Sequence, residues 1–108
     1  MAIYKALIYT AGFAATLLPL QSTQALDAEY LYKERTCIAC HGTKGKAPVM
    51  DEYPKIAGQP ELYLLAQMKD IKHGRRTNAH SVAMKNVMHL ISDDELAVIA
   101  SWLASIKR

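Results

Sequence analysis

The apolar residues near the end of the chain recur at helical spacing and predict one clear helix. Ser92 and Glu95 have the spacing of a capping box, in which each side chain bonds the backbone N–H of the other residue. The residues after them place an apolar stripe along one helix face: Leu96, Ile99, Ala100, Leu103 and Ile106. No window of residues 26–108 alternates apolar and polar positions as a half-buried strand does. The pattern therefore predicts an all-α fold.

A first helix and a long loop are predicted in the part before residue 60. The helix is expected to run from about Asp27, a candidate N-cap, to His41, and Gly42 marks its end. Residues 42–59 are rich in glycine, proline and charged side chains, so we expect them to form a loop.

A second helix is expected to follow this loop. Pro60 has a fixed φ that suits a first helical position, and Gly74 is a suitable stop. Residues 75–83 are polar and show no regular pattern. An apolar patch, interpreted as flanked by loops, then consists of Met84, Val87, Met88, Leu90 and Ile91.

The start of the chain differs in composition from the rest. Lys5 is its one charged side chain, and residues 6–20 are almost wholly apolar. This is the pattern of a secretory signal peptide, with cleavage expected after Ala25. The apolar run is shorter than the ~20 residues of a spanning helix, which favours a cleaved signal over the alternative of an uncleaved anchor. We expect no stable membrane insertion after cleavage. The sequence thus predicts a signal peptide over residues 1–25, one domain over 26–108, and a periplasmic location.

The composition suits a small globular domain that needs internal support. Hydrophobic residues make up 51% of the chain, and the net charge of +3 comes from basic residues scattered among acidic ones, so no nucleic-acid binding is expected. Removing residues 1–25 from the 108 leaves 83, and domains of this size usually recruit disulfides or a metal. Cys37 and Cys40 are too close together for a disulfide that would constrain the unfolded chain much.

Residues 37–41 read CIACH, which is the CxxCH motif for attachment of a c-type haem. Two thiols three residues apart can reach the two vinyl groups of one haem edge, and the next residue then presents its imidazole to the iron. A thioredoxin-like pair would need a βαβ setting, and a structural zinc site would need a second pair of cysteines or similar ligands. We therefore expect one haem c, with thioethers at Cys37 and Cys40 and His41 as an iron ligand.

The haem would also supply the buried surface that so short a chain lacks. A flat apolar macrocycle wrapped by a few helices acts as the centre of the core. Fold and cofactor are therefore one prediction, and a chain that cannot attach haem is expected to stay largely unfolded.

The second axial ligand has several candidates downstream of the motif. They are the methionines and histidines Met50, Met68, His73, His80, Met84, Met88 and His89. Met68 belongs to a helical apolar stripe, where methionine is usually core filler, and Met50 follows too soon after the proximal side. The histidines are interpreted as surface residues. Met84 and Met88 share the apolar segment before the last helix, and both remain candidates.

Three stretches resemble class I cytochromes c, closest to the small bacterial periplasmic type whose domain also occurs in tandem in dihaem cytochromes. They read LYKERTCIACHG, YPKIAGQPELYLLAQMKDIKHGRR and MKNVMHLISDDELAVIASWLAS. The resemblance implies a cytochrome c fold, with three main helices and a short one wrapped around one covalently attached haem. In that family the axial methionine stands eight residues before the serine that opens the last helix. Counting back from Ser92 selects Met84 as the second iron ligand, opposite His41.

The resemblance also implies roles for three further residues. Pro54 matches the proline whose carbonyl accepts the Nδ1 proton of His41, which fixes the ring and raises its basicity. Tyr63 and Trp102 match aromatic residues that pack near the haem, although both also read as ordinary core aromatics.

Iron held by histidine and methionine has no open site, so the resemblance implies electron transfer and no enzymatic activity of the chain itself. We expect a shuttle, or the haem subunit of a periplasmic dehydrogenase, whose redox partner is a dehydrogenase or a terminal oxidase. Lys44, Lys46 and Lys55 would either dock an acidic partner or merely keep the protein soluble. The alternative is a haem-based binder or sensor of small gas ligands with a labile sixth ligand. A peroxidase would need a distal acid–base pair, which is not evident, although His80 or His89 could serve if Met84 left the iron.

Overall fold

The computed structural model describes residues 8–18 and 26–108, so the expected cleavage site after Ala25 lies outside the described residues. Within these ranges the regular secondary structure is entirely helical, which confirms the all-α prediction. No helix in these ranges is long and apolar enough to cross a membrane. The elements are α1 (Ala28–Glu34), α2 (Cys37–His41), the 3₁₀ turn η1 (Thr43–Gly45), α3 (Glu61–Lys72), α4 (Ser81–Met88) and α5 (Asp93–Ser105).

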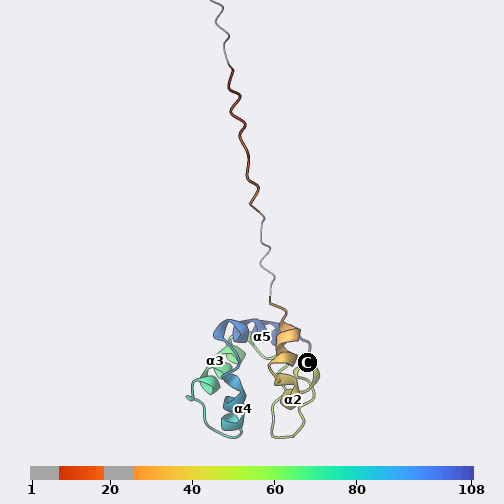
Figure 1. Ribbon diagram of the computed structural model, residues 1–108. Coiled ribbons are helices and arrows are strands. Elements are labelled where there is room, and N and C mark those ends of the chain that lie inside the picture. Colours follow the sequence, from red (N-terminus) through yellow and green to blue (C-terminus); the bar gives the residue numbers. More distant parts are fainter. Residues whose placement is uncertain (1–7, 19–25) are drawn as a thin grey trace, which may run out of the picture.

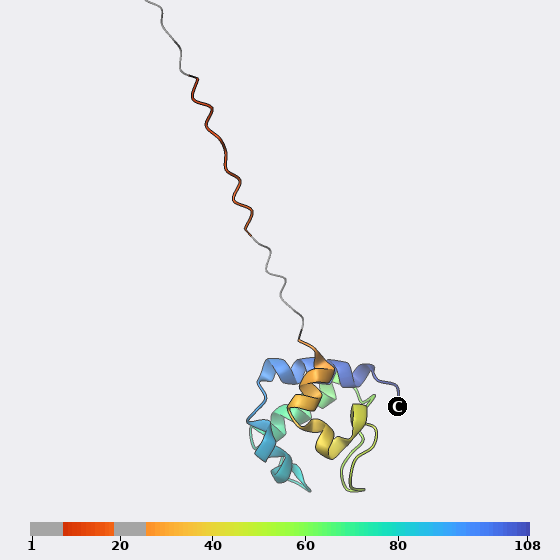
Figure 2. The same ribbon diagram turned by 45° about the vertical axis from the view of Figure 1, so that its right-hand side comes forward.

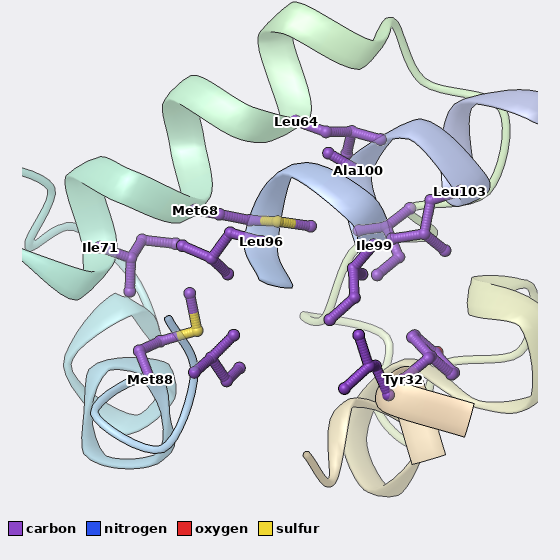
Figure 3. Close-up of a cluster of buried hydrophobic side chains, with 12 residues drawn as sticks. Tyr32, Leu64, Met68, Ile71, Met88, Leu96, Ile99, Ala100 and Leu103 are labelled. Atoms are coloured by element: carbon purple, nitrogen blue, oxygen red, sulfur yellow. The ribbon is translucent and has the colours of Figure 1, made fainter. Parts of the chain in front are cut away.

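Helix α5 joins the two sides of the domain. It packs against α1 on one side and α3 on the other, and α4 packs against α3 (Figures 1 and 2). Four residues of its predicted apolar stripe are buried, namely Leu96, Ile99, Ala100 and Leu103, whereas Ile106 follows the helix and is only partly buried. Core side chains of α1, α3 and α4 gather beneath the stripe (Figure 3). Helix α5 therefore spans the top of the domain in Figure 1, with α3 and α4 below it on one side and α2 on the other.

The start of α5 has the predicted capping box and an added ion pair. Ser92 Oγ accepts a hydrogen bond from Glu95 N at 3.2 Å, and Glu95 Oε1 accepts one from Ser92 N at 3.0 Å. Glu95 Oε2 also accepts from Arg35 Nη2 at 2.9 Å, which ties the end of α1 to α5. The backbone N–H of Ser92, and next the Arg35 guanidinium, lower the pKa of the Glu95 carboxyl.

We expect the substitution Glu95→Gln to lower the free energy of unfolding by about 1 kcal/mol at neutral pH, because glutamine can keep the capping box but loses the ion pair. The folded carboxyl has a lowered pKa, so its contribution is complete above the unfolded value of about 4.3 and is lost as the pH falls through the folded value. Urea unfolding of the haem-loaded protein at pH 7 and near pH 3 measures this. Asp94→Asn, an exposed change of equal charge, is the control; equal losses in both variants would contradict the role of Arg35.

Helix α3 has nearly the predicted bounds. It begins at Glu61 and not at Pro60, which lies just outside the helix and offers its carbonyl to Leu64 N at 3.0 Å. Its end is followed by Gly74, whose φ of 75° is the left-handed conformation that glycine adopts readily after a helix.

The first predicted helix is interrupted, so the expectation of one continuous helix over residues 27–41 is wrong. Thr36 has a left-handed φ of 66° and separates α1 from α2. Tyr32 and His41 are nine residues apart, which on one continuous helix would place them on opposite faces. Both are instead buried and line one pocket, so the change of direction at Thr36 brings them together.

The chain also forms a helix, α4, where the sequence predicts an irregular segment and an apolar patch. The resemblance implied one short helix besides three main ones, whereas the described residues form two short helices, α2 and α4. Met84, Val87, Met88 and Ile91 do have helical i, i+3, i+4 and i+7 spacing, so a signal was present. The residue before the helix is His80, whose side chain makes no capping hydrogen bond. The sequence therefore lacks the Ser, Thr, Asp or Asn N-cap that usually marks the start of a helix.

Candidate functional site

A largely apolar pocket lies beneath α5, with α2 on one side and α4 on the other. It holds about 1060 Å³ between its walls, including its opening to solvent. The roof is formed by the apolar face of α5, with Leu96, Ile99 and Leu103. Five of the seven residues predicted for the site line this pocket: Cys37, Cys40, His41, Pro54 and Met84.

His41 is held in the geometry of a metal-binding imidazole. Its Nδ1 lies 3.0 Å from the carbonyl oxygen of Pro54, the contact that the family resemblance implies. A carbonyl can only accept, so Nδ1 carries the proton and Nε2 keeps a free lone pair. Burial lowers the pKa of His41, while the bond to Pro54 opposes this, so the ring is neutral at neutral pH. The side chain is therefore ready to bind a metal through Nε2.

The loop that carries Pro54 is held in place by hydrogen bonds to the backbone of Gly45. The carbonyl of Gly45 accepts hydrogen bonds from Ile56 N at 3.0 Å and from Ala57 N at 3.2 Å. Gly45 has a φ of 68°, and a Cβ there would lie 2.7 Å from Ile56 Cγ1. A larger residue at position 45 would therefore displace the segment that orients His41.

The two cysteines are free thiols in a setting unlike that of a redox pair. Cys37 is partly buried and Cys40 is exposed. Burial raises the pKa of Cys37 to about 11, and the charge of Cys40 acts in the same direction. Reactive CxxC thiols have lowered pKa values, so this environment disfavours thioredoxin-like chemistry. In the described part of the chain, no three His, Cys, Asp or Glu side chains come together as a metal cluster.

Helix α4 presents two methionines to the pocket. Met88 is 2% exposed and packs in the core near Ile71 and Leu96 (Figure 3). Met84, one turn earlier, is partly buried and lies at the edge of that core. Met88 is thus fixed by its neighbours, whereas Met84 has more freedom to reach into the pocket.

Tyr63 and Trp102 are not brought to the pocket lining. Tyr63 is 52% exposed on α3 and lies in a separate polar groove. Trp102 is partly buried and packs on Tyr32, with ring centroids 5.3 Å apart. Tyr32, which the sequence analysis did not assign, lines the pocket and donates its hydroxyl to the carbonyl of Gly42. Burial raises the pKa of Tyr32 to about 12, which keeps it a donor.

The polar part of the lining was also not assigned to the site from the sequence. It includes Arg35, Tyr53, Arg76 and His80. Arg35 stands two residues before the first cysteine, so its nearness to the motif was a usable signal. The other three come from loops whose approach depends on the tertiary fold. The lysines considered for docking, at positions 44, 46 and 55, are exposed and do not line the pocket.

A family model described as "Cytochrome c" matches residues 25–107, nearly the whole chain. The chain belongs to the cytochrome c family. The cofactor that this family carries is haem c with its iron, attached covalently, so the cofactor prediction is confirmed. The family match also confirms the resemblance to class I cytochromes c and the predicted cytochrome c fold.

The cytochrome relatives differ in length. Cytochrome c4 of Pseudomonas aeruginosa is 47% identical over 75 residues, which cover 69% of this chain and 35% of the relative. Cytochrome c-554(548) of Halomonas halodenitrificans is 36% identical over 72 residues, 65% of this chain and 83% of the relative. The thiosulfate dehydrogenase electron acceptor of Stutzerimonas stutzeri is 36% identical over 70 residues, 65% of this chain and 32% of the relative. The chain spans about a third of the length of the cytochrome c4 relatives.

The pocket residues of this cytochrome fit a haem c. Two free thiols lie on one short helix beside a neutral imidazole, and methionine side chains come from the other side of the pocket. Most other lining residues are apolar, as the faces of a macrocycle require. Cys37 and Cys40 would hold the group by thioethers, and His41 would bind the iron.

Proposed function

We propose that this protein is a periplasmic electron carrier with one haem c, ligated by His41 and Met84. The arrangement that supports this best is a neutral imidazole on α2 and a methionine thioether on α4 that line the same apolar pocket. Figure 1 shows α2 and α4 on different sides of the domain. When bound, the haem supplies a one-electron couple, and methionine ligation raises its potential.

The residues of the chain set the properties of this couple. Pro54 fixes the orientation of His41 and strengthens it as a ligand. The apolar walls disfavour the extra charge of the oxidised form, which raises the potential further. Met84 is favoured over Met88 because Met88 is already packed in the core. If His41 and Met84 both bind the iron, no coordination site would be left for a substrate, so we propose a carrier and not an enzyme.

Location and partners belong to the same proposal. The composition of residues 1–25 supports a signal peptide, which leaves a mature domain of 26–108 in the periplasm. Two of the relatives are named thiosulfate dehydrogenase electron acceptor, which supports electron transfer with a partner protein. We propose a dehydrogenase or a terminal oxidase as that partner, with the chain acting as a free shuttle or as a haem subunit.

Spectroscopy of the mature protein tests the proposal. We expect covalently bound haem in a pyridine haemochrome assay, an iron–methionine charge-transfer band in the ferric state, and no change when carbon monoxide is added to the reduced protein. Carbon monoxide binding in the native protein would instead support a gas binder or sensor. Absence of covalent haem would overturn the assignment altogether.

A further inference from the structure

Tyr53 and His80 lie against each other at the pocket lining, and neither has a role in the proposed iron ligation. Their ring centroids are 5.3 Å apart and their planes meet at 85°, an edge-to-face contact. Tyr53 is partly buried and His80 is exposed. Tyr53 comes from the loop between η1 and α3, and His80 is the residue just before α4.

Each of these residues is attached to the segment that carries one proposed axial ligand. Tyr53 directly precedes Pro54, whose carbonyl lies 3.0 Å from His41 Nδ1. The carbonyl of His80 accepts a hydrogen bond from Met84 N at 3.2 Å, so His80 belongs to the first turn of the helix that carries Met84. The aromatic contact therefore links the support of one ligand to the support of the other.

Few other interactions hold these two segments together. Within the described residues, no hydrogen bond or ion pair joins residues 42–59 to residues 75–91. The two sides are otherwise connected through α5, which packs against α1 and α3 (Figure 1). The Tyr53–His80 contact thus adds a side-chain link between the two segments that does not run through α5.

The start of α4 has little local stabilisation of its own. The helix is eight residues long and has no side-chain cap, so several of its first N–H groups depend on other partners. Ala79, just before His80, has a φ of 48°, a left-handed conformation that is costly for alanine. The contact of His80 with Tyr53 therefore adds a tertiary interaction to a turn that has few local ones.

We propose that Tyr53 and His80 form a clasp that holds α4 against the proximal loop, and that both are positioning residues for Met84. The inference rests on the proposed function, in which Met84 is the sixth ligand. With haem bound, a closed clasp would keep Met84 in position to bind the iron and would exclude external ligands. With the clasp open, an external imidazole would replace the Met84 thioether as the iron ligand, with no net electron transfer.

Imidazole titration of the ferric holoprotein tests the clasp. We expect Tyr53→Leu and His80→Gln each to raise the apparent imidazole binding constant by about two- to tenfold, the range that one aromatic pair contributes. The double variant should show no more than the larger single effect, because both changes remove the same contact. Tyr53→Phe, which keeps the ring, should restore the native constant.

Controls separate the clasp from general effects. Tyr30→Leu and His89→Gln change exposed residues of the same types that do not line the pocket, and both should leave the constant unchanged. Unchanged constants in both clasp variants, or additive effects in the double variant, would overturn the proposal. If Tyr53→Leu does not fold, His80→Gln, an exposed change, carries the test. A native ferric protein without the methionine band would overturn the proposed ligation itself, which the starting spectrum shows before any titration.

Discussion

Replacing both Cys37 and Cys40 by alanine will leave the domain of residues 26–108 largely unfolded. The change removes both thioethers, and with them the group expected to fill the space beneath α5. Without that group, the inner faces of α2, α4 and α5 border a water-filled space, which costs the domain much of its apolar burial. Small domains have a total stability of only about 5–15 kcal/mol, so a loss of this kind exceeds what they can tolerate.

Far-UV circular dichroism and limited proteolysis of the double variant measure this loss. We expect most of the helical signal to disappear and the chain to be digested rapidly. Single variants keep one thioether and should fold with reduced stability, so they serve as matched controls. A double variant that resists protease and melts cooperatively would show that the helices form a core without covalent haem.

Met84→Ala will have the largest effect on the redox properties. The ferric iron–methionine band should vanish, carbon monoxide should bind to the reduced protein, and the reduction potential should fall by on the order of 100 mV, since axial ligands tune it strongly. Met84 is only partly buried, so the loss of stability should be small beside these changes.

Met88→Leu is the matched control, because Met88 lines the same pocket one helical turn later. It is 2% exposed, so a change of nearly equal volume should cost about 1 kcal/mol of stability and leave the methionine band in place. Spectra and potentiometric titrations of the two variants decide between them. If the band survives in Met84→Ala and is lost in Met88→Leu, the ligand is Met88 and our assignment is wrong.

Much of the fold could be predicted because its signals are local in the sequence. The N-cap at Asp27 is confirmed by a hydrogen bond from Tyr30 N at 3.1 Å. The capping box of α5 and the glycine after α3 are confirmed in the same way. In each case the residue type and its partner lie within about one helical turn, so no knowledge of tertiary structure was needed.

The rest depends on contacts that are distant in the sequence. The break at Thr36 brings Tyr32 and His41 to one pocket. The residues next to Thr36 include no glycine or proline that would predict this break. The contact of Tyr53 with His80 joins two segments that are far apart in the sequence. Neither segment has a motif or a periodic pattern that predicts this pair. The cofactor was predictable from five residues, whereas the complete lining of its pocket needed the fold.

The position of α5 along the chain has a consequence for biogenesis. This helix contacts both sides of the domain, yet it follows α1 to α4 in the sequence. If the export that we propose runs N-terminus first, the domain would close only after α5 has emerged on the far side of the membrane. The CIACH segment would emerge earlier and stay accessible during that interval, so the order of the helices would separate cofactor attachment from folding in time.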